Sequence, residues 1–201
     1  MSGAAEHGGD LGKVVLATAN PHKVEEISAL LPEVDFVSRP DDVPDVVEDA
    51  GTLVGNARLK AVALAEATGL PALADDTGLF VDALDGAPGV EAAYFAGPDA
   101  TYAENVDKLL TELDGVEEAR RTASFQTIAL LRFPDGSEIV ARGVVDGVIV
   151  GERRGSSAFG YDPVFVPVDG DGRSFGEMSD DEKSSISHRA RAMQELRRLI
   201  S

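Results

Sequence analysis

Two adjacent carboxylates, Asp75 and Asp76, end the mostly apolar run Leu70–Ala74 and are followed by Thr77 and Gly78. Successive side chains of a strand point to opposite faces, so if the strand persists, one carboxylate can act in a cleft while the other holds structure. Carboxylates at the end of a buried strand suit a divalent cation and an activated water. The alternative is a strand that stops at a polar turn, because Asp, Thr and Gly all favour turns.

A second polar group lies near the N-terminus, where the Val- and Leu-rich stretch Lys13–Thr18 predicts a short buried strand followed by a polar turn and a helix. Thr18, Asn20 and Lys23 fall where the start of a helix offers N–H groups to a phosphate. The segment is not a P-loop, because the required glycines and the GK[ST] sequence are absent. The alternative is an ordinary helix cap beside a surface lysine.

A third group accompanies the helix predicted over Thr52–Thr68, whose apolar residues recur at three- and four-residue steps. Glu48 comes just before it, and Asn56 and Lys60 share one face at i and i+4. Such a face is either solvated or lines a cleft.

Aromatic and cationic residues follow in the C-terminal half. The segment Gly155–Pro163 is rich in small residues, which let a backbone approach a ligand, and Phe159 or Tyr161 can stack on a flat ring. The alternative is a flexible connector with an anchoring aromatic.

A helix is predicted over Ser179–Arg198, with a capping box between its first residue and Glu182. Lys183, His188 and Arg189 make a local cationic cluster in this helix, although a lone histidine is usually structural or exposed.

The secondary-structure elements that must position these residues alternate between strands and helices in the first half of the chain, and strands predominate after that. Besides those above, strands are predicted at 35–38, 72–75, 79–81, 123–133, 138–145, 148–150 and 164–168, with turns at 134–136 and 146–147 and a helix at 100–113. This order predicts an α/β fold with a mixed sheet that contains a long antiparallel ribbon.

Composition narrows the function classes. The 201 residues, 43% of them hydrophobic, suit one domain or two tightly joined lobes. A net charge of −18 argues against a nucleic-acid-binding surface but allows a local cationic pocket for a small anion.

No apolar run approaches the roughly 20 residues of a membrane span. Residues 1–12 lack the features of a signal peptide and predict a flexible tail on a cytoplasmic protein. The absence of cysteine excludes disulfides and a thiolate nucleophile.

Taken together, these groups meet the demands of one ligand class. Carboxylates at Asp76 and Glu48 suit a cation, and Lys23 and Lys60 suit a polyphosphate. An aromatic ring at Phe159 suits stacking on a purine. The combination predicts a nucleoside triphosphate site.

From Val14 to its C-terminus the sequence resembles the inosine/xanthosine triphosphate pyrophosphatases, the HAM1-like family. The motifs that carry the resemblance are Thr18-Ala-Asn-Pro-His-Lys23, Asn56-Ala-Arg-Leu-Lys60, Ala74-Asp-Asp-Thr-Gly-Leu79, Gly86-Ala-Pro-Gly89, Phe159-Gly-Tyr-Asp-Pro163 and Glu182-Lys-Ser-Ser-Ile-Ser-His-Arg189. The resemblance implies hydrolysis of ITP, dITP and XTP between the α- and β-phosphates, which yields the monophosphate and pyrophosphate. It also implies Mg²⁺, a homodimer, and a single domain over 13–201 whose long mixed sheet and flanking helices form two lobes around a nucleotide cleft.

The resemblance further implies roles for matching residues. Asp76 would be the catalytic carboxylate and a metal ligand, supported at the metal by Asp75 and Glu48. Substrate would be bound by Thr18, Ala19, Asn20, Pro21, His22, Lys23, Lys60, Thr77, Phe159, Gly160, Tyr161, Asp162, Lys183, His188 and Arg189.

Within that set, His188 and Arg189 would read the purine 6-oxo group. A donor at this point pairs with hypoxanthine or xanthine and leaves the amino group of adenine unpaired, which a hydrogen-bonding site rejects strongly. Guanine also has a 6-oxo group, so its rejection must come from the 2-position. Two alternatives remain open: a Maf-like pyrophosphatase that acts on other nucleotides, and a nucleotide sensor without turnover.

Overall fold

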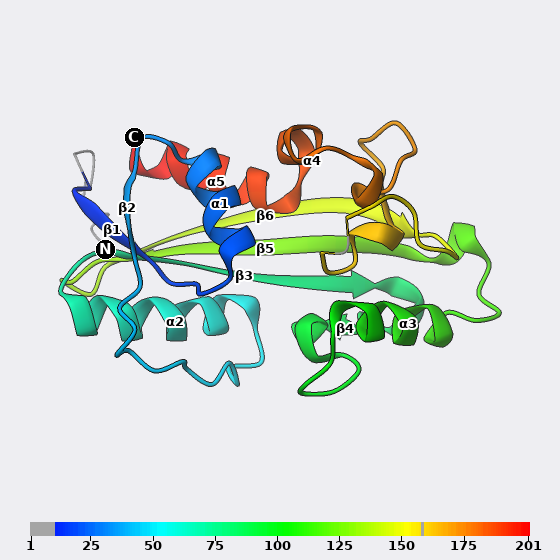
Figure 1. Ribbon diagram of the computed structural model, residues 1–201, viewed down its shortest axis with the longest axis horizontal. Coiled ribbons are helices and arrows are strands. Elements are labelled where there is room, and N and C mark those ends of the chain that lie inside the picture. The colour runs from blue at the N-terminus through cyan, green and yellow to red at the C-terminus, as the bar shows by residue number, and fades with distance from the viewer. Residues whose placement is uncertain (1–10, 158) are drawn as a thin grey trace, which may run out of the picture. The chain divides into compact units, whose positions relative to one another are not determined.

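The structure is a computed structural model that describes residues 11–157 and 159–201, so most of the predicted tail over 1–12 lies outside the described residues. The described residues form five α-helices (Figure 1): α1 (Pro21–Leu30), α2 (Leu53–Thr68), α3 (Tyr102–Glu112), α4 (Asp180–Ile186) and α5 (His188–Ile200). They also form the strands β1 (Lys13–Leu16), β2 (Asp35–Ser38), β3 (Ala72–Val81), β4 (Pro88–Gly89), β5 (Thr122–Arg132), β6 (Glu138–Ile149) and β7 (Phe165–Pro167). None of the helices in the described part of the chain is both long and apolar enough to cross a membrane.

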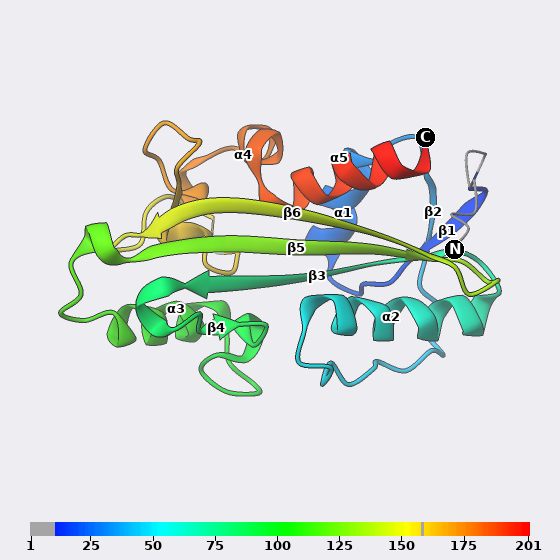
Figure 2. The same cartoon turned by 180° about the vertical axis from the view of Figure 1, so that it is seen from behind.

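The strands make one mixed sheet in the order β2-β1-β3-β5-β6-β7, with β4 paired to β3. β1 runs parallel to both β2 and β3, whereas β4 is antiparallel to β3 and β7 is antiparallel to β6. The long strands β5 and β6 are neighbours joined by a tight turn, in which the N–H of Phe133 donates to the carbonyl of Ser137 at 3.0 Å (Figure 2). The predicted α/β fold with a long mixed sheet is therefore confirmed.

The chain divides into two compact units. The first comprises the chain up to Asp76 together with residues 127–143 and 189–201, and the second comprises residues 77–126 and 144–188. β3, β5 and β6 each contribute residues to both units. The candidate site residues accordingly fall into two groups, one in each unit.

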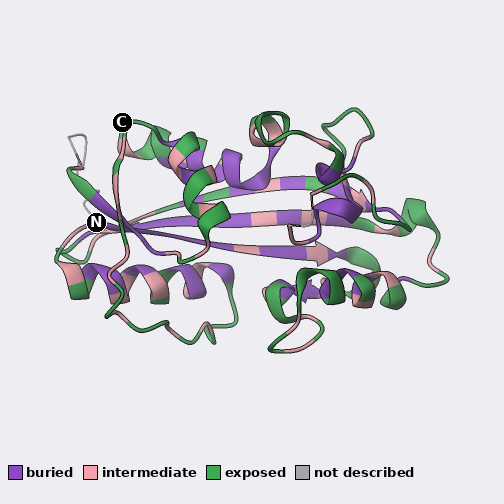
Figure 3. Cartoon of the chain, in the orientation of Figure 1, coloured by how far each residue is buried: buried purple, intermediate pink, exposed green. Residues whose placement is uncertain are grey.

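The first unit has its own apolar core. In this unit, α2 covers one face of the sheet and α1 and α5 cover the other (Figures 1 and 2). α2 has a buried stripe along its length (Figure 3), and the buried residues of this helix include Ala57 and Ala61. On the other face, Ile27 of α1 and Met193 of α5 are fully buried.

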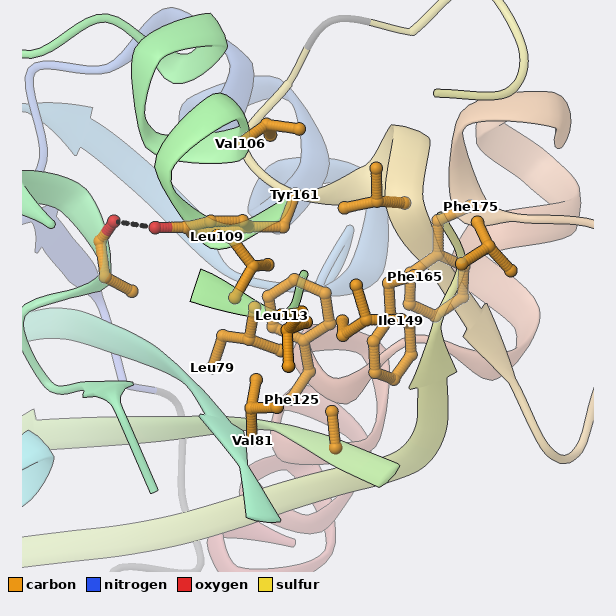
Figure 4. Close-up of a cluster of buried hydrophobic side chains, with 14 of the residues drawn as sticks. Leu79, Val81, Val106, Leu109, Leu113, Phe125, Ile149, Tyr161, Phe165 and Phe175 are labelled. Atoms are coloured by element: carbon orange, nitrogen blue, oxygen red, sulfur yellow. Dashed lines mark hydrogen bonds between the residues drawn. The ribbon is translucent and has the colours of Figure 1, made fainter. Parts of the chain in front are cut away.

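The second unit is built around aromatic side chains (Figure 4). The rings of Phe125 and Phe165 meet edge to face at 4.7 Å, and those of Phe165 and Phe175 stack at 5.3 Å. Tyr161 is buried in the same cluster, and its hydroxyl donates to the carbonyl of Ala92 at 2.8 Å. Offset and edge-to-face contacts of this kind add stability beyond the area that they bury.

Two predicted breaks in strands are wrong. The turn expected between residues 75 and 79 is absent, because β3 runs unbroken from Ala72 to Val81. The carboxylates inside it stay in the strand because lysine and arginine side chains pair with them. The turn expected at Asp146-Gly147 is also absent, because β6 is one strand.

Gly147 serves packing rather than a turn. A Cβ at this position would collide with the ring of Phe165 and would lie 2.5 Å from the carbonyl oxygen of Val166, both on the neighbouring strand β7 or at its start. The absence of a side chain at Gly147 thus leaves the space that the Phe165 ring occupies. The sequence shows the glycine but does not show which ring will lie across it.

This packing gives a first prediction. Replacing Gly147 with Ala should lower the free energy of unfolding by about 1–3 kcal/mol, because overpacking forces the Phe165 ring or the backbone of β7 to shift. Urea titration measures the loss. Gly151→Ala is the matched control, since its new methyl group would meet only Arg121 Nη1, at 3.5 Å. Equal stability of the two variants would contradict this assignment.

The single helix predicted over 179–198 is also wrong, since α4 ends at Ile186 and α5 begins at His188. Ser187 between them has extended backbone angles, φ −66° and ψ 157°. Serine is favoured just before a helix, but apolar periodicity does not register one extended residue. The predicted capping box between Ser179 and Glu182 is confirmed.

Candidate active site

Both adjacent carboxylates of β3 are buried in the first unit, and each pairs with a different cation. Asp76 accepts a hydrogen bond from Lys60 Nζ at 3.1 Å, whereas Asp75 accepts from Lys23 Nζ at 3.2 Å. The alternation of side chains along a strand separates the two environments. The sequence expectation that the two carboxylates diverge therefore holds, although they lie within the strand instead of at its end.

Lys60 joins Asp76 to Glu48. Its ammonium group donates to Asp76 Oδ1 at 3.1 Å and to Glu48 Oε2 at 2.9 Å. α2 positions this lysine, and Asn56, one turn earlier, accepts from the N–H of Ala50 at 3.1 Å and so holds the segment after Glu48. Burial lowers the pKa of Lys60, but Asp76, together with Asp75 and Glu48, outweighs that effect and raises it. Lys60 is therefore a cation between two carboxylates.

The second oxygen of Asp76, Oδ2, is buried and has no hydrogen-bond partner among the described residues. Burial raises the pKa of Asp76 to about 6; Glu48 acts in the same direction and Lys60 opposes it. An unpaired buried carboxylate oxygen is costly unless a ligand completes it. The unpaired Oδ2 of Asp76 therefore indicates a place where a cation, or a water molecule that accompanies the substrate, can bind.

The donor chemistry around Asp76 fits Mg²⁺. This ion is usually held by one or two carboxylates together with substrate phosphates and waters, not by a complete protein cage. Asp76 and Glu48 supply such oxygens, and the described residues contain no cluster of three or more His, Asp or Glu side chains that would form a cage.

The raised pKa of Asp76 predicts a pH-dependent stability of the metal-free protein. A raised folded-state pKa penalises folding above about pH 6, and the penalty vanishes as the pH falls below the unfolded-state value near 3.8. Asp76→Asn should therefore stabilise the protein by about 1–3 kcal/mol at pH 8 in chelator, and the gain should shrink between pH 6 and pH 4. Urea titrations at both ends of this range test it; a gain that grows toward low pH would contradict it.

Asp75 is the centre of a buried ion-pair network. Its Oδ2 lies 3.1 Å from Lys23 Nζ and 3.2 Å from Arg189 Nε, and Arg189 also donates from Nη1 to Glu26 at 2.6 Å. Burial alone would raise the pKa of Asp75, but Lys23, Arg189 and Lys60 outweigh it and hold that pKa well below its usual range. Burial lowers the pKa of Lys23 itself. Asp75 thus holds two cations in place.

The predicted phosphate loop, Thr18–Lys23, leads into α1. Asn20 caps this helix by accepting from the N–H of His22 at 3.1 Å, and Thr18 Oγ1 accepts from the N–H of Asn20 at 3.2 Å. The cap that the sequence allowed as an alternative is therefore present. Lys23, in the first turn, directs its ammonium group to Asp75.

In the second unit, Lys183 and Asp162 form a compact polar pair beside aromatic rings. Lys183 Nζ donates to the buried Asp162 Oδ2 at 2.6 Å and lies 5.3 Å from the centre of the Phe159 ring and 5.9 Å from that of Phe175. A cation over an aromatic ring is attracted by the ring's quadrupole. Gly160 follows with a positive φ of 55°, which turns the chain toward Tyr161.

His188 and Thr77 complete the second group. His188 is buried, and its ring stacks on that of Phe125 at 4.6 Å. Thr77 follows Asp76 on β3 and is half-buried. The structure therefore brings Thr18–Lys23, Glu48, Lys60, Asp75, Asp76 and Arg189 into one unit and Thr77, Phe159–Asp162, Lys183 and His188 into the other.

Sequence reasoning missed Glu26 and Tyr102. Glu26 lies one turn after Lys23 on α1 and pairs with Arg189, which is 163 positions away. The i, i+3 spacing from Lys23 was visible, but the distant partner was not. Tyr102, which meets the ring of Phe159, lies outside every motif quoted above.

A buried carboxylate flanked by lysines on an α/β scaffold has the parts of a phosphoryl-transfer site. The chain belongs to the Ham1 family, whose model matches residues 14–199. This match spans both units and all of the groups described above.

Curated relatives agree with the family assignment. The chain is similar to a dITP/XTP pyrophosphatase of Opitutus terrae, with 48% identity over 198 residues that cover 92% of this chain and 96% of the relative. It is also similar to a dITP/XTP pyrophosphatase of Streptomyces avermitilis, with 44% identity, 92% coverage of this chain and 94% of the relative.

Solved structures have the same fold. A HAM1 protein from Coxiella burnetii matches with a TM-score of 0.86 and 39% identity, covering 94% of this chain and 98% of the other. A nucleoside-triphosphatase, dITP/XTP pyrophosphatase, from Mycobacterium abscessus matches with a TM-score of 0.74 and 38% identity, covering 92% and 97%.

Proposed function

We propose that this protein hydrolyses dITP, ITP and XTP to the nucleoside monophosphate and pyrophosphate, and so removes deaminated purines from the nucleotide pool. The observation that carries this proposal is the unpaired, buried Oδ2 of Asp76 beside Lys60 and Glu48. Membership of the Ham1 family and the similarity to dITP/XTP pyrophosphatases supply the substrate class.

The reaction assigns a proton acceptor and a set of charges to the first unit. Asp76 accepts a proton from the attacking water, whose oxygen forms a bond to the α-phosphorus while the bond from that phosphorus to the bridging oxygen breaks. Pyrophosphate leaves with the bonding electrons. Lys60 and Lys23 stabilise the negative charge that spreads over the phosphate oxygens. Mg²⁺, held by Asp76 and Glu48 with Asp75 in support, would add positive charge at the triphosphate.

In this proposal the residues that recognise the base belong to the second unit, except for Arg189, which belongs to the first. Phe159 stacks on the purine, with Lys183 and Asp162 as the polar pair beside it. His188 and the next residue along the chain, Arg189, donate to the 6-oxo group. An adenine amino group leaves these donors unpaired, and a site built on hydrogen bonds rejects such a base strongly.

A substrate panel tests the function. Pyrophosphate release is measured from ITP, XTP, GTP, ATP and dTTP, with and without Mg²⁺. We expect Mg²⁺-dependent release from ITP and XTP and little from ATP or GTP. Release spread over ordinary nucleotides would favour the Maf-like alternative, and binding of ITP without any release would favour a sensor.

We also propose a homodimer in the cytoplasm, where the nucleotide pool is. Similarity to the Ham1 family supports this proposal. Sedimentation of the full chain at micromolar concentration distinguishes a dimer from a monomer.

A further inference from the structure

The ring of Phe159 is contacted by a side chain from a different segment of the second unit. Tyr102, the first residue of α3, meets it edge to face, with 5.2 Å between ring centres and 64° between ring planes. Edge-to-face pairs at this distance attract each other, because the positive edge of one ring meets the negative face of the other. Tyr102 is partly exposed, with 41% of its surface accessible, so packing of the core does not explain this placement.

Several hydrogen bonds fix the backbone at the start of α3, where Tyr102 lies. Thr101 caps the helix in a complete capping box: its hydroxyl accepts from the N–H of Glu104 at 3.2 Å, and the Glu104 carboxylate accepts from the N–H of Thr101 at 2.7 Å. The buried Asn105 accepts from the N–H of Ala96 at 2.7 Å and donates to the carbonyl of Ala93 at 2.9 Å.

A second contact links α3 to the segment that leads to Phe159. Arg153 donates to Asp107 Oδ1 at 2.9 Å and to the carbonyl of Ala103 at 2.8 Å. Both acceptors belong to α3, and Arg153 precedes Phe159 by six positions. The helix therefore contacts the Phe159 segment at the guanidinium of Arg153 and at the ring of Tyr102.

The same segment is held again between these two contacts. The N–H groups of Ser156 and Ser157 both donate to the carbonyl of Gly176, at 3.0 and 3.3 Å. Gly155 packs so tightly on the backbone of Gly176 that any Cβ there would collide with it. After these contacts the chain reaches Phe159, whose ring is then held by Tyr102.

We infer that Tyr102 is a positioning residue for the nucleobase: it holds the Phe159 ring in the orientation in which a purine stacks on it. This inference rests on the proposed function, because it takes Phe159 as the stacking residue. Tyr102 acts through Phe159 and is not assigned a contact with the reacting phosphates. It therefore affects base affinity and leaves the chemical step unchanged.

Steady-state kinetics with ITP test the inference. In Tyr102→Ala, KM should rise about 3- to 10-fold while kcat changes less than about twofold, because the Phe159 ring loses the edge-to-face contact that holds it for stacking. Tyr102→Phe keeps the ring and should retain the wild-type KM. A Tyr102→Ala variant with wild-type KM, or a Tyr102→Phe variant as impaired as Tyr102→Ala, would overturn it.

A double-mutant cycle separates positioning from a general effect on folding. If Tyr102 acts through Phe159, then adding Tyr102→Ala to Phe159→Ala should raise KM no further. Additive effects of the two substitutions would overturn the inference. Failure of the proposed function is a distinct outcome, because wild-type protein would then release no pyrophosphate from ITP at all.

Discussion

Replacing Asp76 with Asn should reduce kcat for ITP by about 10²–10⁴-fold, because the amide can neither accept the proton of the attacking water nor carry the negative charge that a cation requires. The variant should still bind nucleotide, since Lys23, Lys60 and the second unit are untouched. Rapid-quench measurement of pyrophosphate gives the rate, and calorimetric titration of ITP onto the variant gives the affinity.

The matched control is Asp99→Asn, which removes an exposed carboxylate from the second unit and should leave kcat at the wild-type value. If Asp76→Asn turned over ITP at the wild-type rate, Asp76 would not be the proton acceptor. Loss of binding together with loss of turnover would instead make Asp76 a substrate-affinity residue.

Replacing Arg189 with Ala should lower the free energy of unfolding by about 3–5 kcal/mol, because it removes a charged partner of the buried Asp75 and of the partly buried Glu26. Asp75 and Glu26 would both lose a charged donor, and the side chains of Arg189 and Asp75 are each 1% exposed. Urea denaturation at neutral pH measures the loss. Asp75, whose pKa is held low in the native state, should then make the variant less sensitive to acid than the wild type.

Arg197→Ala is the control for the buried network, because Arg197 is on the same helix and also pairs with a glutamate, Glu33. Arg197 is 44% exposed and Glu33 47%, and exposed ion pairs contribute only about 0–1 kcal/mol. Equal losses in the two variants would mean that burial of the Asp75 network does not set its energetic importance.

Much of the scaffold could be predicted because its signals are local. The strand at Asp35–Ser38 and the helix that Thr52 caps were predicted within one residue of their observed bounds. The predicted strand breaks were wrong because the observed structure there depends on partners that are distant in the sequence. Asp75 stays inside a strand because Arg189, 114 positions later, pairs with it, and Gly147 stays inside a strand because Phe165 crosses it. No local pattern carries this information.

The candidate site was named largely through motifs that resemble a family, and its chemistry was read from residue types. The structure adds that Lys60 pairs with both Asp76 and Glu48. The sequence alone does not show this pairing, because Glu48 and Lys60 lie 12 positions apart in separate segments. The sequence did not indicate Glu26 or Tyr102, because each contacts a residue that is distant in the sequence.

The most direct test of the central claim is the identity of the products formed from ITP by the wild-type protein with Mg²⁺. Phosphorus NMR of the completed reaction should show inosine monophosphate and pyrophosphate in equal amounts, with no inosine diphosphate at any time. Accumulation of inosine diphosphate and inorganic phosphate would mean that water attacks the γ-phosphorus, and it would contradict the reaction assigned to Asp76.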